Sequence, residues 1–171
     1  GRDVDGEGRG RMFVKGQSMM KRYWNNPEKT AATIVDGWMD TGDVFIRDSE
    51  GCYVCCGRND DMLKVSGRWV SPFEIESALI EHAKVVEAAV VGRGDKDGFV
   101  RIEAWIVLRD QADACDLIAE EIRAFCKSRL APYKYPRAIE FRDALTKTQT
   151  GKLQRYVLRQ SEAQPARGAA R

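Results

Sequence analysis

The alternation of apolar and polar positions predicts a small sheet covered by helices in the C-terminal two thirds of the chain. Residues 85–91 are almost continuously apolar, which is typical of a central strand buried on both faces. Residues 100–108 alternate between apolar and polar, as in a half-buried strand, and residues 138–141 supply a third strand. From about residue 113, apolar residues recur at helical spacing, so we expect an amphipathic helix that covers the sheet. The fold class indicated is α+β.

A β-hairpin and a capped helix are expected just before this sheet. Residues 62–70 contain two short β-capable runs around Ser66-Gly67, a pair typical of a hairpin turn. Ser71 is a preferred N-cap residue, a proline follows at the first helical position, and a glutamate three residues after the cap completes a capping box. These signals predict a helix over residues 72–81.

The first third of the chain is rich in β signals but has no pattern that would close a core alone. Strands are expected at residues 11–15, 44–47 and 52–56, and residues 37–43 indicate a tight turn. After Gly57, a cation and three polar turn-forming residues indicate an exposed hinge.

The predicted organisation has four parts. They are a β-rich part at residues 1–57, a hinge at 58–61, a small α+β domain at 62–160 and a disordered tail rich in Ala, Gly and Arg at 161–171.

Composition narrows the partners only slightly. The chain is 43% hydrophobic and 32% charged, and its net charge of +2 gives no reason to expect a nucleic-acid partner. No apolar run approaches the length of a membrane span, and the first residues lack the apolar core of a signal peptide, so we expect a cytoplasmic protein without a membrane partner. The sequence does not begin with Met, which indicates a fragment.

The five cysteines and the single histidine are not expected to bind a metal. Cys52 and Cys55 have the spacing of a redox or zinc pair, but no second close pair accompanies them, and Cys115 and Cys126 are eleven residues apart in a predicted helix. We expect reduced thiols that act as small hydrophobes. His82 is expected on the surface near a helix C-terminus.

Two short stretches have residue types suited to nucleotide chemistry. In Thr41-Gly42-Asp43, a carboxylate beside a glycine could accept hydrogen bonds from both hydroxyls of a ribose, although an aspartate that only caps a turn fits the same spacing. In residues 146–152, a glycine beside Lys152 would allow close contact with a phosphate or carboxylate, although lysines in loops are usually just solvated. The Gly-x4-Gly-Lys-Ser/Thr spacing of a phosphate-binding loop is absent.

Several segments, in order along the chain, resemble the acyl-adenylate-forming superfamily of acyl-CoA synthetases, luciferases and peptide-synthetase adenylation domains. The junction Asp-Asp-Met-Leu-Lys-Val-Ser-Gly is most similar to the benzoate-type aryl-CoA ligases. Thr146 stands where the superfamily usually has proline. The matching residues include Tyr23, Trp24, Trp38, Thr41, Gly42, Asp43, Gly57, Arg58, Asp60, Asp61, Ser66, Gly67, Val70, Pro72, Glu74, Ile75, Glu76, Lys147, Thr148, Gly151, Lys152 and Arg155.

The resemblance implies the C-terminal part of an ATP-dependent carboxylate–CoA ligase that acts on an aromatic acid. Residues 1–57 would then end a large N-terminal domain, most of which is missing, and residues 62–160 would be the small lid domain. A carboxylate and MgATP would give an acyl adenylate and pyrophosphate, after which coenzyme A would displace AMP. ATP, Mg²⁺ and coenzyme A are the implied cofactors.

The resemblance also implies roles for individual residues. Lys152 would be catalytic, Asp43 and Arg58 would hold the ribose, and Asp60 would be the pivot of the small domain. Lys152 is also the expected target of a lysine acyltransferase that switches the enzyme off. The hairpin residues expected on the coenzyme A side are Lys64, Ser66, Gly67, Arg68 and Trp69.

Two other functions stay open on the sequence. A peptide-synthetase adenylation domain has similar motifs, but the chain ends about twenty residues after Lys152, which leaves no room for a carrier domain. The small domain could instead be a non-catalytic binding or oligomerisation module. Because the phosphate loop and acyl pocket of the large domain are missing, we expect this chain alone to be inactive.

Overall fold

The computed structural model describes residues 7–94 and 98–161, which divide after Asp61 into two compact units. From residue 162 onward, the predicted disordered tail lies outside the described residues, as do residues 95–97 of the loop between two predicted strands.

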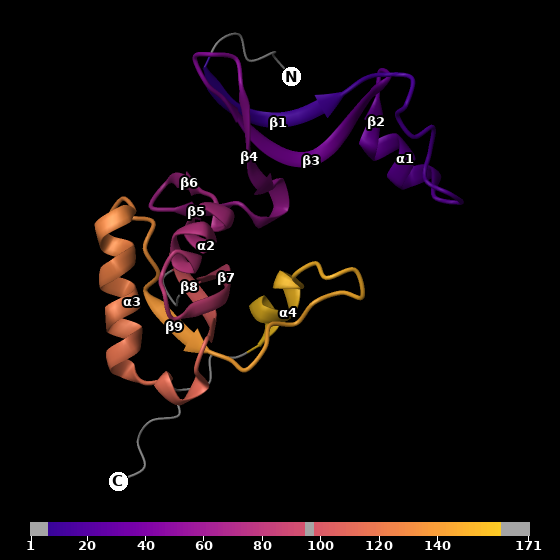
Figure 1. Ribbon diagram of the computed structural model, residues 1–171. Helices are drawn as coiled ribbons and strands as arrows, with labels where there is room; N and C mark the ends of the chain where they lie inside the picture. The colour runs from indigo at the N-terminus through magenta and orange to yellow at the C-terminus, as the bar shows by residue number, and fades with distance from the viewer. Residues whose placement is uncertain (1–6, 95–97, 162–171) are drawn as a thin grey trace. The chain divides into compact units, whose positions relative to one another are not determined.

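The first unit is built on an antiparallel sheet in which β3 pairs with each of the other strands (Figure 1). Asn26 caps its helix by accepting a hydrogen bond from the Lys29 N–H at 3.0 Å, and a proline occupies the first helical position, where no N–H is needed. The elements are β1 (Gly8–Val14), α1 (Pro27–Thr33), β2 (Ile34–Val35), β3 (Trp38–Arg47), β4 (Tyr53–Arg58) and the short 3-10 helix η1 (Asn59–Asp61).

The tight turn predicted at residues 37–43 is wrong, because most of these residues belong to the long strand β3. The β1–β3 register shifts opposite Thr41-Gly42-Asp43, and the β3–β4 register shifts next to it, so the segment is a bulge within the sheet. Gly42 has a φ of +74°, in the left-handed region that glycine tolerates without a steric penalty from Cβ. Gly42 in the sequence indicated an unusual backbone conformation. That this conformation is a bulge depends on the pairing of β3 with β1 and β4.

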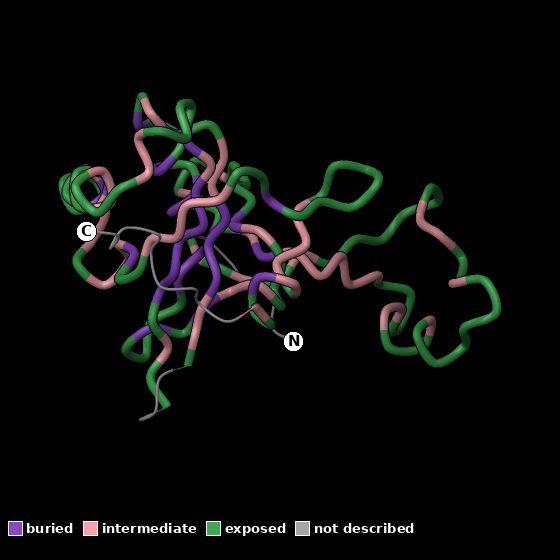
Figure 2. The backbone as a smooth tube through the Cα atoms, turned by 90° about the horizontal axis from the view of Figure 1, so that it is seen from below, coloured by how far each residue is buried: buried purple, intermediate pink, exposed green. Residues whose placement is uncertain are grey.

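Few residues of the first unit are buried (Figure 2). Among its described apolar residues, Val44 and Cys56 are buried, whereas Trp24 and Trp38 are exposed. The first unit therefore has only a small core of its own.

The second unit confirms the predicted α+β class, with a three-stranded sheet flanked by helices and preceded by a two-stranded hairpin (Figure 1). Its sheet has the order β7-β8-β9, antiparallel between the first two strands and parallel between the last two. The elements are β5 (Leu63–Val65), β6 (Arg68–Val70), α2 (Pro72–Ile80), β7 (Val85–Gly94), β8 (Val100–Leu108), the 3-10 helix η2 (Gln111–Asp113), α3 (Asp116–Arg129), β9 (Ala138–Phe141) and α4 (Arg155–Gln160).

The central strand of this sheet is β8, and not the run at residues 85–91 that the apolar pattern had indicated. Strand β7 lies at an edge, yet several of its side chains are buried because helices pack near both of its faces. Strand β8 includes the buried polar residue Glu103, which broke its apolar pattern and made it resemble a half-exposed strand. Burial on both faces therefore did not distinguish a covered edge strand from a central one.

The core of the second unit consists of two clusters on opposite faces of the sheet. The larger cluster joins alternate residues of β7 and β8 to Ile75 and Leu79 of α2 and to Ile122 and Cys126 of α3, together with apolar residues of the hairpin. The smaller cluster joins the intervening positions, among them Trp105, to Leu158 of α4 and to residues of the segment before it. Because strand side chains alternate between faces, helices α2 and α3 cover one face and α4 covers the other.

The prediction that His82 lies on the surface is wrong, since its side chain is buried just after α2. Its Nε2 lies 3.3 Å from Oε1 of Glu121, and its ring meets that of Phe125 edge to face with centroids 4.9 Å apart. Both partners come from α3, about forty residues further along the chain. The local sequence placed His82 correctly at a helix end but carried no information about the helix that covers it.

Candidate functional site

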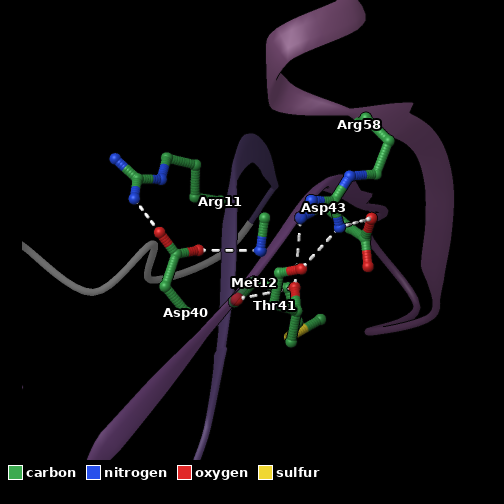
Figure 3. A network of polar contacts seen from close by, with 7 residues as sticks. Arg11, Met12, Asp40, Thr41, Asp43 and Arg58 are labelled. Atoms are coloured by element: carbon green, nitrogen blue, oxygen red, sulfur yellow. Dashed lines mark hydrogen bonds and ion pairs between the residues drawn. The ribbon is translucent and has the colours of Figure 1, made fainter. Parts of the chain in front are cut away.

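The Thr41-Gly42-Asp43 bulge and Arg58 form one polar network in the first unit (Figure 3). Arg58, the last residue of β4, donates from Nη1 to the carbonyl of Thr41 at 2.8 Å and to Oδ1 of Asp43 at 3.2 Å. The guanidinium lies directly over Gly42, where an added Cβ would come within 2.7 Å of Nη2. The structure thus brings together Asp43 and Arg58, the two residues expected to bind a nucleotide.

Residues that the sequence reasoning missed support this bulge from the other side. Asp40 accepts a hydrogen bond from the Gly42 N–H at 2.9 Å and forms an ion pair with Arg11 of β1. The Thr41 hydroxyl donates to the Met12 carbonyl at 2.9 Å and accepts from the Asp43 N–H at 3.2 Å. These contacts hold the backbone of the bulge, while the Asp43 side chain remains about one third exposed and open to a ligand.

Asp60, the expected pivot, is exposed on η1 at the end of the first unit. The division between the two compact units follows one residue later, between Asp61 and Met62. Asp60 is therefore placed where the chain passes from one unit to the other.

The hairpin of the second unit has the geometry that its central pair predicts. Ser66 and Gly67 have φ angles of +48° and +77°, and Lys64 pairs with Trp69 across the two strands. Positive φ at both central positions is the signature of a type I′ turn, whose twist matches that of the flanking strands. A Cβ on Gly67 would meet no atom within 4 Å, so the glycine faces open space.

The side chains of the hairpin present cations and an aromatic ring to solvent. Lys64 and Arg68 are exposed, and Trp69 retains 49% of its accessible surface. The Arg68 guanidinium also lies 4.8 Å from the centre of the Tyr133 ring. An exposed surface with cations and an indole suits a ligand that carries both phosphates and a flat base.

The segment with Lys152 is a tight loop closed by its own hydrogen bonds. Thr148 N–H donates to the Lys152 carbonyl at 2.8 Å, and the Lys152 N–H donates to the Thr148 hydroxyl at 3.1 Å. Gln154 N–H donates to the Thr146 carbonyl at 2.9 Å, beside a β-bridge between Lys147 and Leu153. The backbone of Lys152 is therefore held although its side chain is exposed.

The two lysines of this loop differ in their surroundings. Lys147 Nζ donates to Oε1 of Glu87 at 2.7 Å. Within residues 7–94 and 98–161, the Lys152 ammonium forms no hydrogen bond or ion pair. The ammonium of Lys152 is thus available to an anionic ligand, whereas that of Lys147 is already paired.

A buried ion pair at the base of the loop was not anticipated. Arg155, the first residue of α4, donates from Nη2 to both carboxylate oxygens of Glu76 at 2.9 and 2.7 Å. The sequence did offer a signal, because Glu76 falls within the apolar face that Ile75 and Leu79 form on the same helix. A glutamate at such a position is expected to have a charged partner.

The hairpin and the Lys152 loop lie on opposite faces of the second unit. Hairpin residues Leu63 and Val70 belong to the core cluster beneath α2 and α3, whereas Leu145 and Leu153, which flank the Lys152 turn, pack into the cluster beneath α4. The structure therefore keeps the hairpin, expected on the coenzyme A side, apart from the loop that carries Lys152 within this unit.

The cysteines and acidic residues do not form a metal centre in the described part of the chain. All five cysteines lie in the described residues and none is joined in a disulfide; Cys56 and Cys126 are buried. No group of three His, Cys, Asp or Glu side chains in the described residues is arranged to bind a metal ion. Within the same residues, no helix is both long and apolar enough to span a bilayer.

Residues 74–152, from the first turn of α2 to Lys152, match the family described as AMP-binding enzyme C-terminal domain. These residues belong to that family. Over 150 residues the chain is 53% identical to the benzoate–CoA ligase of Thauera aromatica, a match that covers 88% of this chain and 28% of that protein. The predicted resemblance to the acyl-adenylate-forming superfamily is thereby confirmed at the level of its AMP-binding enzyme C-terminal domain.

Solved structures agree with this assignment. A crystal structure of an anthranilate CoA ligase in complex with anthranoyl-AMP superposes with a TM-score of 0.88 at 40% identity, covering 93% of this chain and 31% of that one. A benzoate CoA ligase from Burkholderia xenovorans superposes with a TM-score of 0.83 at 48% identity, covering 94% of this chain and 32% of that one. The chain thus spans less than a third of the length of each of these proteins.

Proposed function

We propose that this chain is the C-terminal part of an ATP-dependent ligase that joins an aromatic carboxylic acid to coenzyme A through an acyl adenylate. The observation that carries the proposal is the exposed Lys152 ammonium on a hydrogen-bonded loop, within a domain of the AMP-binding family. The 53% identity to a benzoate–CoA ligase supports the benzoate type of substrate. The acyl pocket itself would belong to the large N-terminal domain.

In the first half-reaction, the substrate carboxylate attacks the α-phosphorus of ATP, and pyrophosphate leaves. Negative charge grows on the oxygens around phosphorus in the transition state, and the Lys152 ammonium stabilises that charge. The Asp43 carboxylate accepts hydrogen bonds from the ribose hydroxyls, and Arg58 holds it in the required direction from 3.2 Å. ATP is used with Mg²⁺, for which we assign no ligand in this chain.

In the second half-reaction, the thiolate of coenzyme A attacks the acyl carbonyl, and AMP leaves as the thioester forms. The hairpin serves this step, because the open space beside Gly67 admits the pantetheine arm and Lys64, Arg68 and Trp69 present groups suited to the phosphates and the adenine. Since the hairpin and the Lys152 loop lie on opposite faces of the unit, one orientation cannot offer both. The second unit therefore rotates about Asp60 between the steps.

The half-reactions of the full-length enzyme test this proposal separately. Lys152→Ala is expected to lower the rate of adenylate formation about 10²- to 10³-fold, while the conversion of a supplied acyl adenylate to thioester changes by less than about threefold. Gly67→Leu is expected to do the reverse, because its side chain would fill the space for pantetheine. Pyrophosphate exchange measures the first step, and thioester formation from the adenylate measures the second.

Gly67→Ala separates obstruction from backbone strain. It carries the same positive-φ penalty at +77° but adds only a methyl group, which meets no atom within 4 Å. It should therefore retain most of the thioester step that Gly67→Leu loses. Equal loss of both steps in Lys152→Ala and Gly67→Leu would contradict the two-orientation mechanism.

The same assays distinguish the alternative functions. Transfer of the acyl group to a carrier-protein pantetheine, but not to coenzyme A, would indicate a peptide-synthetase adenylation domain. Absence of adenylate formation by the wild-type full-length protein would indicate a non-catalytic module. Acylation of Lys152 by a lysine acyltransferase removes its charge, so the acylated enzyme should behave like Lys152→Ala.

A further inference from the structure

Glu76 is a buried carboxylate that joins three separate elements of the second unit. Its side chain is 8% exposed, and its Oε1 accepts a hydrogen bond from the Val90 N–H of β7 at 2.7 Å. Both of its oxygens also accept from Nη2 of Arg155, whose Nε lies 3.3 Å from Oε1. One side chain of α2 thus holds the edge of the sheet and the start of α4.

The pair bridges the two faces of the sheet around its open edge. Among the described residues, β7 pairs with β8 on one side and with no strand on the other, so the Val90 N–H on that other side would lack a strand partner. Glu76 reaches this edge from the helix on one face, and Arg155 reaches it from the helix on the opposite face. Charge-assisted bonds of a guanidinium to both oxygens of a carboxylate are strong and directional, so the pair restricts how α4 can move.

Arg155 follows Lys152 by only three residues, and the intervening residues are themselves held. Leu153 packs into the smaller core cluster, and the Gln154 N–H donates to the Thr146 carbonyl. The Lys152 backbone is bonded in both directions to Thr148. The position of the Lys152 Cα is therefore linked to Glu76 through a short and rigid path.

We propose that the Glu76–Arg155 ion pair positions Lys152. The ion pair holds the loop that carries Lys152 in place for adenylate formation, and it has no part in the thioester step. The role of Lys152 in this proposal rests on the proposed function. Misplacement of a catalytic group by about 1 Å can lower a rate on the order of 10²-fold. Loss of the pair should therefore reduce a single half-reaction without removing any group that touches the substrate.

Arg155→Met is the most direct variant, because it preserves much of the side-chain volume and leaves Glu76 able to accept from Val90. Glu76→Gln tests the same interaction from the other side, since its amide oxygen can still accept from Val90. Arg155→Lys keeps the charge but loses the two-pronged geometry, so it should restore part of the function. Ile122→Ala is the control for stability alone, because Ile122 is buried in the other core cluster beneath α3.

The first measurement needs no enzymatic activity and uses the 171-residue chain. In amide hydrogen exchange followed by NMR, Arg155→Met should raise the exchange rates of Thr148, Lys152 and Gln154 at least about tenfold, while Val90 stays protected. Ile122→Ala should lower the thermal midpoint without selectively exposing these three amides. Unchanged exchange of the loop amides in both Arg155→Met and Glu76→Gln would overturn the proposal.

The second measurement uses the full-length enzyme. Arg155→Met and Glu76→Gln should each reduce adenylate formation between about 10- and 100-fold and leave the thioester step within about threefold. Arg155→Lys should recover at least part of the loss, and the double variant should lose little more than either single one, because both remove the same interaction. Parallel reduction of both half-reactions would mean that the pair acts only on folding, and fully additive losses would mean that the two residues act independently of each other; either result would overturn the proposal.

Failure of this proposal can be distinguished from failure of the proposed function. If Lys152→Ala loses adenylate formation while Arg155→Met and Glu76→Gln retain it, the function holds and the positioning role is wrong. If the wild-type full-length protein forms no adenylate, the proposed function is wrong, and the exchange measurement still decides whether the pair holds the loop. If Arg155→Met does not fold, Glu76→Gln and Arg155→Lys decide by the same readouts.

Discussion

Gly42 shows how one missing side chain can organise a polar site. The Arg58 guanidinium occupies the space in which a Cβ of residue 42 would lie, and from there it reaches both the Thr41 carbonyl and the Asp43 carboxylate. The positive φ of Gly42 sets up the bulge that turns these two acceptors toward the arginine. Any other residue would meet both a steric and a conformational obstacle.

We predict that Gly42→Ala weakens ATP binding in the full-length enzyme. The methyl group would come within 2.7 Å of Arg58 Nη2 and displace the guanidinium from Asp43, so KM for ATP should rise about tenfold or more. Gly51→Ala is a matched control, with a φ of +85° but its nearest neighbour, Arg47 Nη2, at 3.7 Å. Both variants should lose about 1–3 kcal/mol of stability from strain, and only Gly42→Ala should change KM. An equal KM for the two variants would contradict the role assigned to Arg58.

At the level of elements, α3 is held against the sheet by a small number of buried residues. Ile122 and Cys126 are its fully buried side chains in the larger core cluster, while much of its remaining surface faces solvent. Burial raises the pKa of the Cys126 thiol to about 11, although the nearby Arg129 acts in the opposite direction. The titration of Cys126 therefore reports on whether α3 is docked.

We predict that the second unit becomes less stable in alkaline solution because Cys126 is buried as a neutral thiol. Above pH 9 the unfolded state releases the thiol proton while the folded state retains it up to about pH 11. The unfolded state then binds fewer protons, so the free energy of unfolding falls through this window, by on the order of 2 kcal/mol from this group. Urea unfolding of the wild type and of Cys126→Ala across this range checks the prediction, and the wild type should lose more stability. Parallel pH profiles would show that the thiol titrates normally in the folded state.

For the whole molecule, the two compact units differ in how much core each possesses. Buried apolar residues are concentrated in the second unit, from Leu63 to Leu158, whereas the first has Val44 and Cys56 among its described residues. A sheet with so small a core depends on further protein for its stability.

We therefore predict that limited proteolysis of the chain cleaves first near residues 57–61 and leaves a resistant fragment that begins close to Met62. The segment around η1 is exposed and lies where the chain passes between units, whereas the second unit has a continuous core on both faces of its sheet. Mass spectrometry of the fragments identifies the cleavage sites. A resistant fragment made of residues 1–60 would contradict the prediction that the second unit is the stable one.

Sequence reasoning identified the motif residues of the candidate site but not the residues that support them. Asp43, Arg58, the hairpin and Lys152 were predicted because each belongs to a short motif with a recognisable spacing. Arg11 and Glu76 act on these motifs from another strand and another helix, so no local window contains both partners. Asp40 lies only two residues from Gly42, but its partner Arg11 is 29 positions away in sequence. The same limit explains His82, whose covering helix begins more than thirty residues later.

Local sequence determined the type of most elements of this protein, because turns, caps and alternation depend on neighbours within a few residues. The type I′ turn at Ser66-Gly67 and the Ser71 cap of α2 both follow from backbone requirements that particular side chains satisfy. Strand order was decided only in the tertiary structure, since β8 became central through β9, which follows a whole helix later. The Glu76–Arg155 pair was likewise decided there, because a buried charge selects its partner by distance in space, and these two residues are 79 positions apart in sequence.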